Sequence, residues 1–94
     1  MIISQDNKIE DVLGSRAKIK ILKTLAENNE LSITQIIRNT RLNHSSVTIH
    51  LNHLKLLNLV QEKNFGRIKI FRYKNENLKA KSLKKFIEIW EGEY

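Results

Sequence analysis

The chain of 94 residues has no cysteine and no proline, and its three glycines lie far apart. The lack of cysteine excludes disulfide bonds and thiolate metal sites, and it fits an intracellular protein. Since no stretch is rich in proline or glycine and no segment repeats, nothing divides the chain into parts. We therefore expect one small domain over residues 1–94 with a single core.

The sequence also lacks an apolar run near the roughly 20 residues that a membrane-spanning helix needs. Its opening segment, MIISQDNKIEDVL, has neither the charged head nor the long apolar stretch of a signal peptide. These two absences predict a cytoplasmic protein without a membrane partner. No nucleophile–base pair, glycine-rich phosphate loop or pair of carboxylates stands out, so we expect no enzymatic activity and no cofactor.

Acidic residues are in the minority. Seventeen lysines and arginines stand against ten aspartates and glutamates, which gives a formal net charge of +7. A domain this basic is a candidate for binding a polyanion such as nucleic acid, although many small basic proteins are merely well solvated.

Hydrophobic periodicity predicts several short helices in the first half of the chain. A short amphipathic turn or helix is expected around Ile9, Val12 and Leu13, ending at Gly14. The stretch RAKIKILKTLAE carries one apolar stripe and predicts a longer helix. After a short extended link, LS, the stretch ITQIIRNT predicts a further helix with Ser32 as its N-cap.

A tight turn, RLN, leads to the next helix, which we expect from His44 to Asn58 with Asn43 as its N-cap. Two strands should follow at residues 59–63 and 67–73, because both stretches are rich in β-branched and aromatic residues. The letters NFG between them predict a hairpin tip in which Gly66 takes a positive φ.

The C-terminal stretch, NENLKAKSLKKFIEIWEGEY, predicts a long helix with a wide apolar stripe. Such a stripe packs either on its own domain or on a second copy of the chain, and we expect the second. The predicted interface of this homodimer combines the stripe with the N-terminal turn: Ile9, Val12, Leu13, Leu83, Phe86, Ile87, Trp90 and Tyr94.

The order of elements predicts a mainly α fold with a small β-hairpin wing, that is, a winged helix-turn-helix. The stretches LGSRAKIKILKTL, LSITQIIRNTRLNHSSVTIHLNHLKLLNLV and GRIKIFRY resemble ArsR-like winged helix-turn-helix transcriptional regulators. The resemblance implies a DNA-binding core at residues 13–74 and a C-terminal dimerisation helix at residues 75–94. The abundance of isoleucine, lysine and asparagine suggests an AT-rich genome such as that of an archaeon.

The resemblance implies a sequence-specific regulator of double-stranded DNA, more precisely a repressor acting as a homodimer at the nucleoid. The helix expected from His44 to Asn58 would enter the major groove, and the wing would touch flanking backbone or minor groove. The residues expected to contact DNA from that helix are His44, Ser45, Ser46, Thr48, Ile49, Asn52 and Lys55. Those expected from the wing are Lys63, Arg67 and Lys69, with further backbone contacts from Arg38, Arg41 and His50.

Two positions depart from the family pattern. Arg41 stands where glycine is common in the turn, which predicts a less sharp turn or a bend at Asn39 or Thr40. Ile49 stands where the family usually has a polar, base-reading residue, so an apolar contact to a thymine methyl is expected there.

The remaining interpretations concern the histidines and the alternative functions of the protein. All three histidines, His44, His50 and His53, fall in one stretch, yet their spacing puts them on different sides of a helix, so we expect no metal site. A titrating histidine would instead tune DNA binding with pH. A low-specificity architectural protein of the nucleoid and a ligand- or metal-responsive sensor are the alternative functions, and any effector is unknown.

Overall fold

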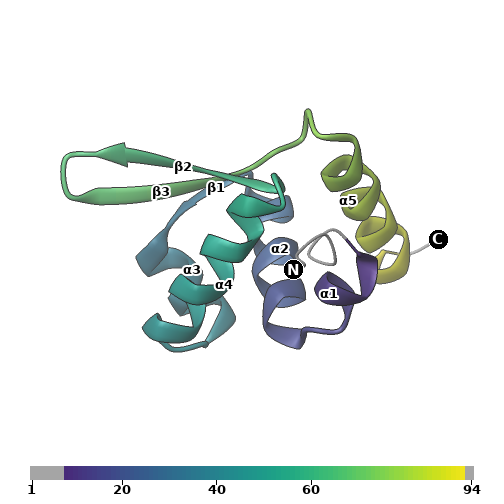
Figure 1. Cartoon of the computed structure of the whole chain (residues 1–94), viewed down its shortest axis with the longest axis horizontal. Coiled ribbons are helices and arrows are strands. Elements are labelled where there is room, and N and C mark those ends of the chain that lie inside the picture. The colour runs from purple at the N-terminus through teal and green to yellow at the C-terminus, as the bar shows by residue number, and fades with distance from the viewer. Residues whose placement is uncertain (1–7, 93–94) are drawn as a thin grey trace, which may run out of the picture.

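A computed structural model describes residues 8–92 of the chain, and it confirms the mainly α fold with a small sheet (Figure 1). The elements run in the order α1 (Ile9–Leu13), α2 (Arg16–Asn28), β1 (Glu30–Ser32), α3 (Ile33–Thr40), α4 (His44–Leu56), β2 (Val60–Phe65), β3 (Ile68–Tyr73) and α5 (Leu78–Glu91). Among the described residues, no helix is long and apolar enough to cross a membrane.

Helix starts follow the capping residues. The predicted caps are confirmed for α3, where Ser32 and Gln35 form a reciprocal capping box, and for α4, where Asn43 Oδ1 accepts from the Ser46 amide at 2.8 Å. Asn77 caps α5 in the same way. The predicted end of α4 is wrong by two residues, because Leu57 already forms its C-cap and Asn58 takes a positive φ of 65°.

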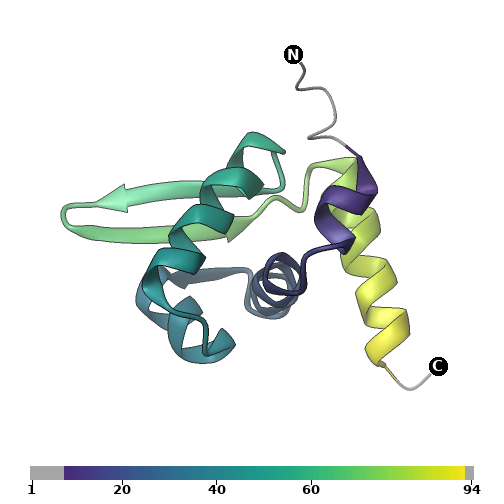
Figure 2. The same cartoon turned by 60° about the horizontal axis from the view of Figure 1, so that its bottom comes forward.

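Helix α2 occupies the centre of the fold. It lies between the α3–α4 pair on one side and the α1–α5 pair on the other (Figure 2). Its apolar stripe buries Ile21, Leu22 and Leu25 completely. The same core takes in residues from α3, α4 and the sheet, including Ile36, Val47, Leu51, Leu54, Phe71 and Tyr73.

The sheet has three antiparallel strands in the order β1-β3-β2. Its strand β1 was predicted only as an extended link, yet Leu31 pairs with Phe71 and closes the sheet beside α3. The predicted tip of the hairpin is also wrong. Phe65 pairs with Ile68, so the strands run to those residues and the turn contains only Gly66 and Arg67. Gly66 has the expected positive φ, at 61°.

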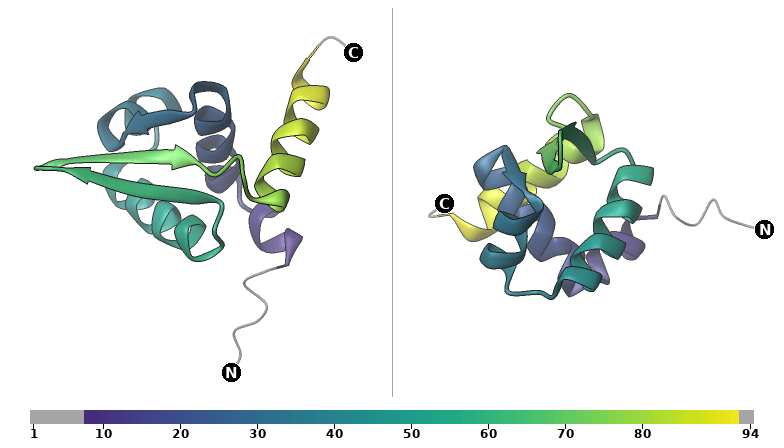
Figure 3. Two further views of the ribbon diagram at one scale, coloured as in Figure 1. Left: turned by 90° about the horizontal axis from the view of Figure 1, so that it is seen from above. Right: turned by 90° about the vertical axis from the view of Figure 1, so that its left-hand side faces the viewer.

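The wing, residues 60–73, projects from one end of the molecule, and α1 and α5 lie at the other (Figure 3). Tyr73 joins the two ends. Its side chain is fully buried, its amide donates to Asn29 O at 2.9 Å, and its hydroxyl donates to Ala80 O in α5 at 2.6 Å. Burial raises the pKa of this phenol to about 12, so it stays a hydrogen-bond donor at any physiological pH.

Candidate nucleic-acid interface

Helix α4 divides cleanly into a buried and an exposed side. Val47, Leu51 and Leu54 are buried, as their spacing predicts. The opposite side exposes four residues at intervals of about one turn, Ser45, Ile49, Asn52 and Leu56. We call these four the reading stripe. A helix that protrudes with an uncovered stripe of this length has the form that fits a major groove about 12 Å wide.

The turn before α4 is as sharp as a glycine turn, although its pivot is an arginine. Arg41 itself takes the left-handed conformation, with φ 61° and ψ 23°, so the expected bend at Asn39 or Thr40 is wrong. Thr40 holds the turn from inside. Its buried hydroxyl donates to Ile36 O at 2.7 Å and accepts from the Leu42 amide at 3.3 Å. The sequence does not predict this role of Thr40, because a threonine near a helix end carries no signal of its hydrogen bonds or burial.

Positive charge predominates in the part of the sequence that contains the reading stripe. No acidic residue occurs between Glu30 and Glu62, a span that contains both α3 and α4. Within residues 8–92, the side chains of Arg38, Arg41, Arg67 and Lys69 are exposed and form no ion pair. Unpaired cations around an exposed helix suit contacts to phosphate oxygens.

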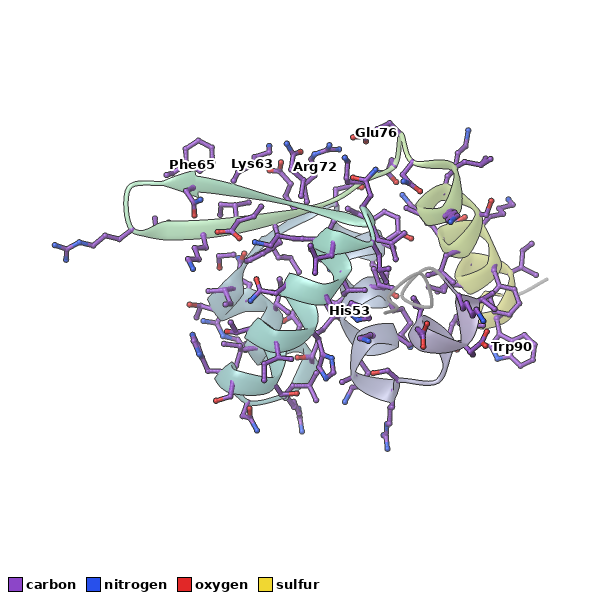
Figure 4. The ribbon with its side chains drawn as sticks, in the orientation of Figure 1. His53, Lys63, Phe65, Arg72, Glu76 and Trp90 are labelled. Carbon is purple, nitrogen blue, oxygen red and sulfur yellow. The ribbon has the colours of Figure 1, made fainter. Side chains whose placement is uncertain are left out.

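Two lysines expected to contact DNA have protein partners. Lys55 Nζ lies 2.6 Å from Glu62 Oε1, and this hydrogen bond lowers the pKa of the Glu62 carboxyl. Lys63 is paired with Glu30 and points to the side of the sheet away from the helices (Figure 4). Each ammonium therefore has a carboxylate partner in the free chain, and the DNA contacts of both lysines stay predictions.

The first turns of α4 are less available than the sequence predicts. His44 and Ser45 are exposed, and Ser46 is half-buried. Thr48 Oγ1 is buried and finds no hydrogen-bond partner in the part of the chain that the structure describes. Its hydroxyl is therefore turned away from solvent in the free chain, and its contact with a base stays a prediction.

His50 lies on the side of α4 that faces α2 rather than on the reading stripe. Its Nδ1 is buried without a hydrogen-bond partner among residues 8–92. Burial lowers the pKa of its imidazole, and the neighbouring charges of Lys18 and His53 lower it further. His50 is half-buried as a residue, and its predicted phosphate contact stays a prediction. Within the described residues, no group of three or more His, Asp or Glu is arranged to hold a metal ion.

A second exposed surface lies at the opposite end of the molecule, where α1 meets α5. Ile9, Leu13, Phe86 and Trp90 are all exposed there, and the rings of Phe86 and Trp90 lie 5.8 Å apart. We call these four residues the apolar end. A groove of about 620 Å³ runs beside it, lined by Ile9, Val12, Leu13, Leu57, Leu59, Leu78, Leu83 and Phe86 among others.

Not every residue assigned to the dimer interface lies on this surface. Ile87 is 9% exposed, and Val12 is 8% exposed and lines the groove from inside, so their place in a dimer interface stays a prediction. Leu83 is half-buried against the core and also lines the groove. Tyr94 lies outside the described residues.

These features define a winged helix-turn-helix domain with exposed cations on α3, in the turn before α4 and in the wing. The chain belongs to the arsR family of bacterial regulatory proteins, because the model of that family matches residues 15–62, just over half of its length. It is accordingly a DNA-binding regulator of transcription by class, in a family of regulators and not of enzymes. No curated protein matches the chain in sequence.

Solved structures share the fold at low identity. HlyU from Vibrio cholerae N16961 matches with a TM-score of 0.75 and 18% identity, covering 86% of this chain and 85% of that one. The transcriptional repressor PagR of Bacillus anthracis gives 0.69 and 22%, covering 82% and 85%. The homodimeric winged helix-turn-helix DNA-binding domain Mb0332 from Mycobacterium bovis gives 0.70 and 22%, covering 85% and 71%.

The depressed pKa of His50 predicts that acid destabilises the fold. The unfolded chain binds a proton at His50 more readily than the folded chain does, so stability is constant above the unfolded pKa of about 6.5 and decreases as pH falls below it. Urea unfolding at pH 7.5 and pH 5.0 measures the difference. His50→Gln should reduce this difference in the free energy of unfolding between the two pH values, whereas the exposed control His44→Gln should not. The same pH dependence of stability in both variants would contradict the role given to His50.

The left-handed Arg41 predicts opposite effects on stability and binding. Arg41→Gly should raise the free energy of unfolding by about 1 kcal/mol, since glycine has no Cβ to strain at this φ. The same change should weaken DNA binding and reduce its salt slope by about 0.9 if Arg41 contacts a phosphate. Arg41→Ala is the matched control, because it removes the cation and keeps the strain. A stabilised glycine variant with unchanged affinity would rule out the phosphate contact.

Proposed function

We propose that the protein is a sequence-specific repressor that binds double-stranded DNA in the cytoplasm as a homodimer, with α4 in the major groove. The observation that carries the proposal is the reading stripe, an uncovered helix face within an acid-free span and beside unpaired arginines. Arg38 and Arg41 would hold the backbone on one side of α4. Arg67 and Lys69 of the wing would contact the flanking backbone or minor groove on the other.

Specific recognition would come from the middle of the stripe. Asn52 is exposed and can pair with adenine through two hydrogen bonds. Ile49 is 66% exposed, and its aliphatic side chain fits the C5-methyl group of thymine. Ser45 adds a short hydroxyl near the start of the helix. This set favours A·T base pairs at the centre of each half-site.

Homodimerisation would proceed through the apolar end. The apolar end exposes two large aromatic and two aliphatic side chains beside an apolar groove. An apolar patch of this kind is typical of a surface that binds a partner. A symmetric dimer would present two α4 helices about one helical turn of DNA apart and select a near-palindrome. The described homodimer of the Mb0332 domain and the repressor PagR support this form of action.

Selection of bound duplexes from a random pool at fixed salt tests the proposal. We expect an inverted repeat with thymine and adenine at matched positions of each half-site. A pool that stays random while the protein still binds would contradict the proposal and indicate an architectural DNA-binding protein instead.

The assignment of Ile49 has a sharper test in the selected site. Replacing thymine by uracil removes only the methyl group, and it should weaken binding of the wild type about fourfold, since a buried methyl contributes about 0.8 kcal/mol. Ile49→Ala should lose this dependence, and Asn52→Ala should lose about 1–3 kcal/mol of preference for adenine. Asn28→Ala, on α2, is the control and should keep both preferences.

The apolar end predicts a dimer that surface charges can dissociate. Phe86→Asp combined with Trp90→Asp should convert the protein to a monomer in sedimentation velocity at micromolar concentration, with helix content retained because both side chains are exposed. Lys81→Asp, on the same helix but outside the groove, is the control. Trp90 is the only tryptophan, so dimerisation should also shift its emission to shorter wavelengths. A wild type that sediments as a monomer would refute this arrangement.

A further inference from the structure

The tip of the wing carries an apolar pair that neither the core nor the reading stripe uses. Phe65 and Ile68 are direct cross-strand partners beside the Gly66–Arg67 turn. They are 62% and 57% exposed. Successive residues of a strand point to opposite faces, so this pair shares one face with Lys63, and that face points away from the helices (Figure 4). The pair is thus too far along the wing and on the wrong face to be covered by its own chain.

We propose that the wing tip enters the DNA minor groove beside the α4 site and that Phe65 and Ile68 act there as an apolar wedge against its wall. This inference rests on the proposed function and adds to it a second kind of readout. The partner it names is deformable duplex DNA.

Charge favours DNA over another protein as the partner. Arg67 occupies the turn itself, and Lys69 lies on the opposite face of the hairpin, across from Asn64. No acidic residue occurs between Glu62 and Glu76, and the carboxylates of Glu30 and Glu62 are paired with Lys63 and Lys55. Apolar side chains flanked by arginine and lysine are typical of proteins that insert wedges into the minor groove, whereas lysine is depleted in protein–protein interfaces.

The dimensions of the hairpin explain what the wedge would read. Paired strands lie about 4.8 Å apart, and the minor groove of B-DNA is about 6 Å wide. Because the strand spacing is measured between the strand axes, the atoms of the hairpin add to this width, and the tip with its phenyl ring can enter only where the groove opens. Pyrimidine–purine steps such as TA open at low cost, whereas A-tracts are stiff and narrow. The pair would consequently favour one arrangement of A·T base pairs over another without a base-specific hydrogen bond.

The test uses two duplexes with the same selected core and flanks of equal composition, one of alternating TA steps and one of A-tracts. The wild type should bind the TA-flanked duplex about tenfold more tightly. Phe65→Thr combined with Ile68→Thr keeps residues that favour strands but removes the wedge, and it should bind both duplexes equally. The fluorescence of 2-aminopurine placed in the TA flank should increase on binding of the wild type only, because the wedge unstacks this base.

The control is Lys69→Ala, on the opposite face of the hairpin. It should retain the preference for the TA flank and lose about 0.9 from the salt slope. A threonine variant that keeps the wild-type preference, or a wild type that binds both flanks equally, would overturn the wedge and leave the proposed function intact. A threonine variant that changes the oligomeric state of the free protein would overturn it in favour of a protein interface. A wild type that binds neither duplex would overturn both proposals.

Discussion

The hydroxyl of Tyr73, held in a fully buried position, is the interaction on which the arrangement of this domain depends. A buried phenol that lost its acceptor would cost about 1–3 kcal/mol, so Ala80 O and the tyrosine must stay together. The bond ties the end of β3 to the start of α5, and the Tyr73 amide ties the same point to the end of α2. The wing and the apolar end are therefore attached to one rigid frame.

That frame also determines what α4 can offer to DNA. Because Val47, Leu51 and Leu54 are packed against the core, helical geometry leaves the reading stripe on the outside. The left-handed Arg41 allows the reversal of the chain that brings α3 against α4, and Thr40 satisfies the backbone inside it. The backbone strain at Arg41 is stable only because packing on both sides requires it.

Elements defined by local chemistry were predictable from the sequence, and those defined by distant partners were not. Periodicity and capping residues predicted four of the five helices within residues 8–92 and a short amphipathic turn or helix at α1, and Asn43 marked the start of α4. Strand β1 was not predicted as a strand, because three residues show no recognisable pattern and become a strand only by pairing with β3. The pairing of Lys55 with Glu62 depends in the same way on packing, since the two lie on different elements. Spacing likewise predicted one apolar stripe on α5, but only the position of α2 decides that Ile87 is buried.

The apolar residues at the proposed DNA contacts suggest a consistent mode of recognition. Ile49 and Leu56 are aliphatic members of the reading stripe, and the wing tip adds Phe65 and Ile68. Arginine and lysine contacts to phosphate supply affinity but no sequence information. Aliphatic contacts distinguish thymine by its methyl group, and a wedge distinguishes flexible steps from stiff ones. Discrimination by this protein would therefore decline less with salt than its affinity does, because the contacts that discriminate carry no charge.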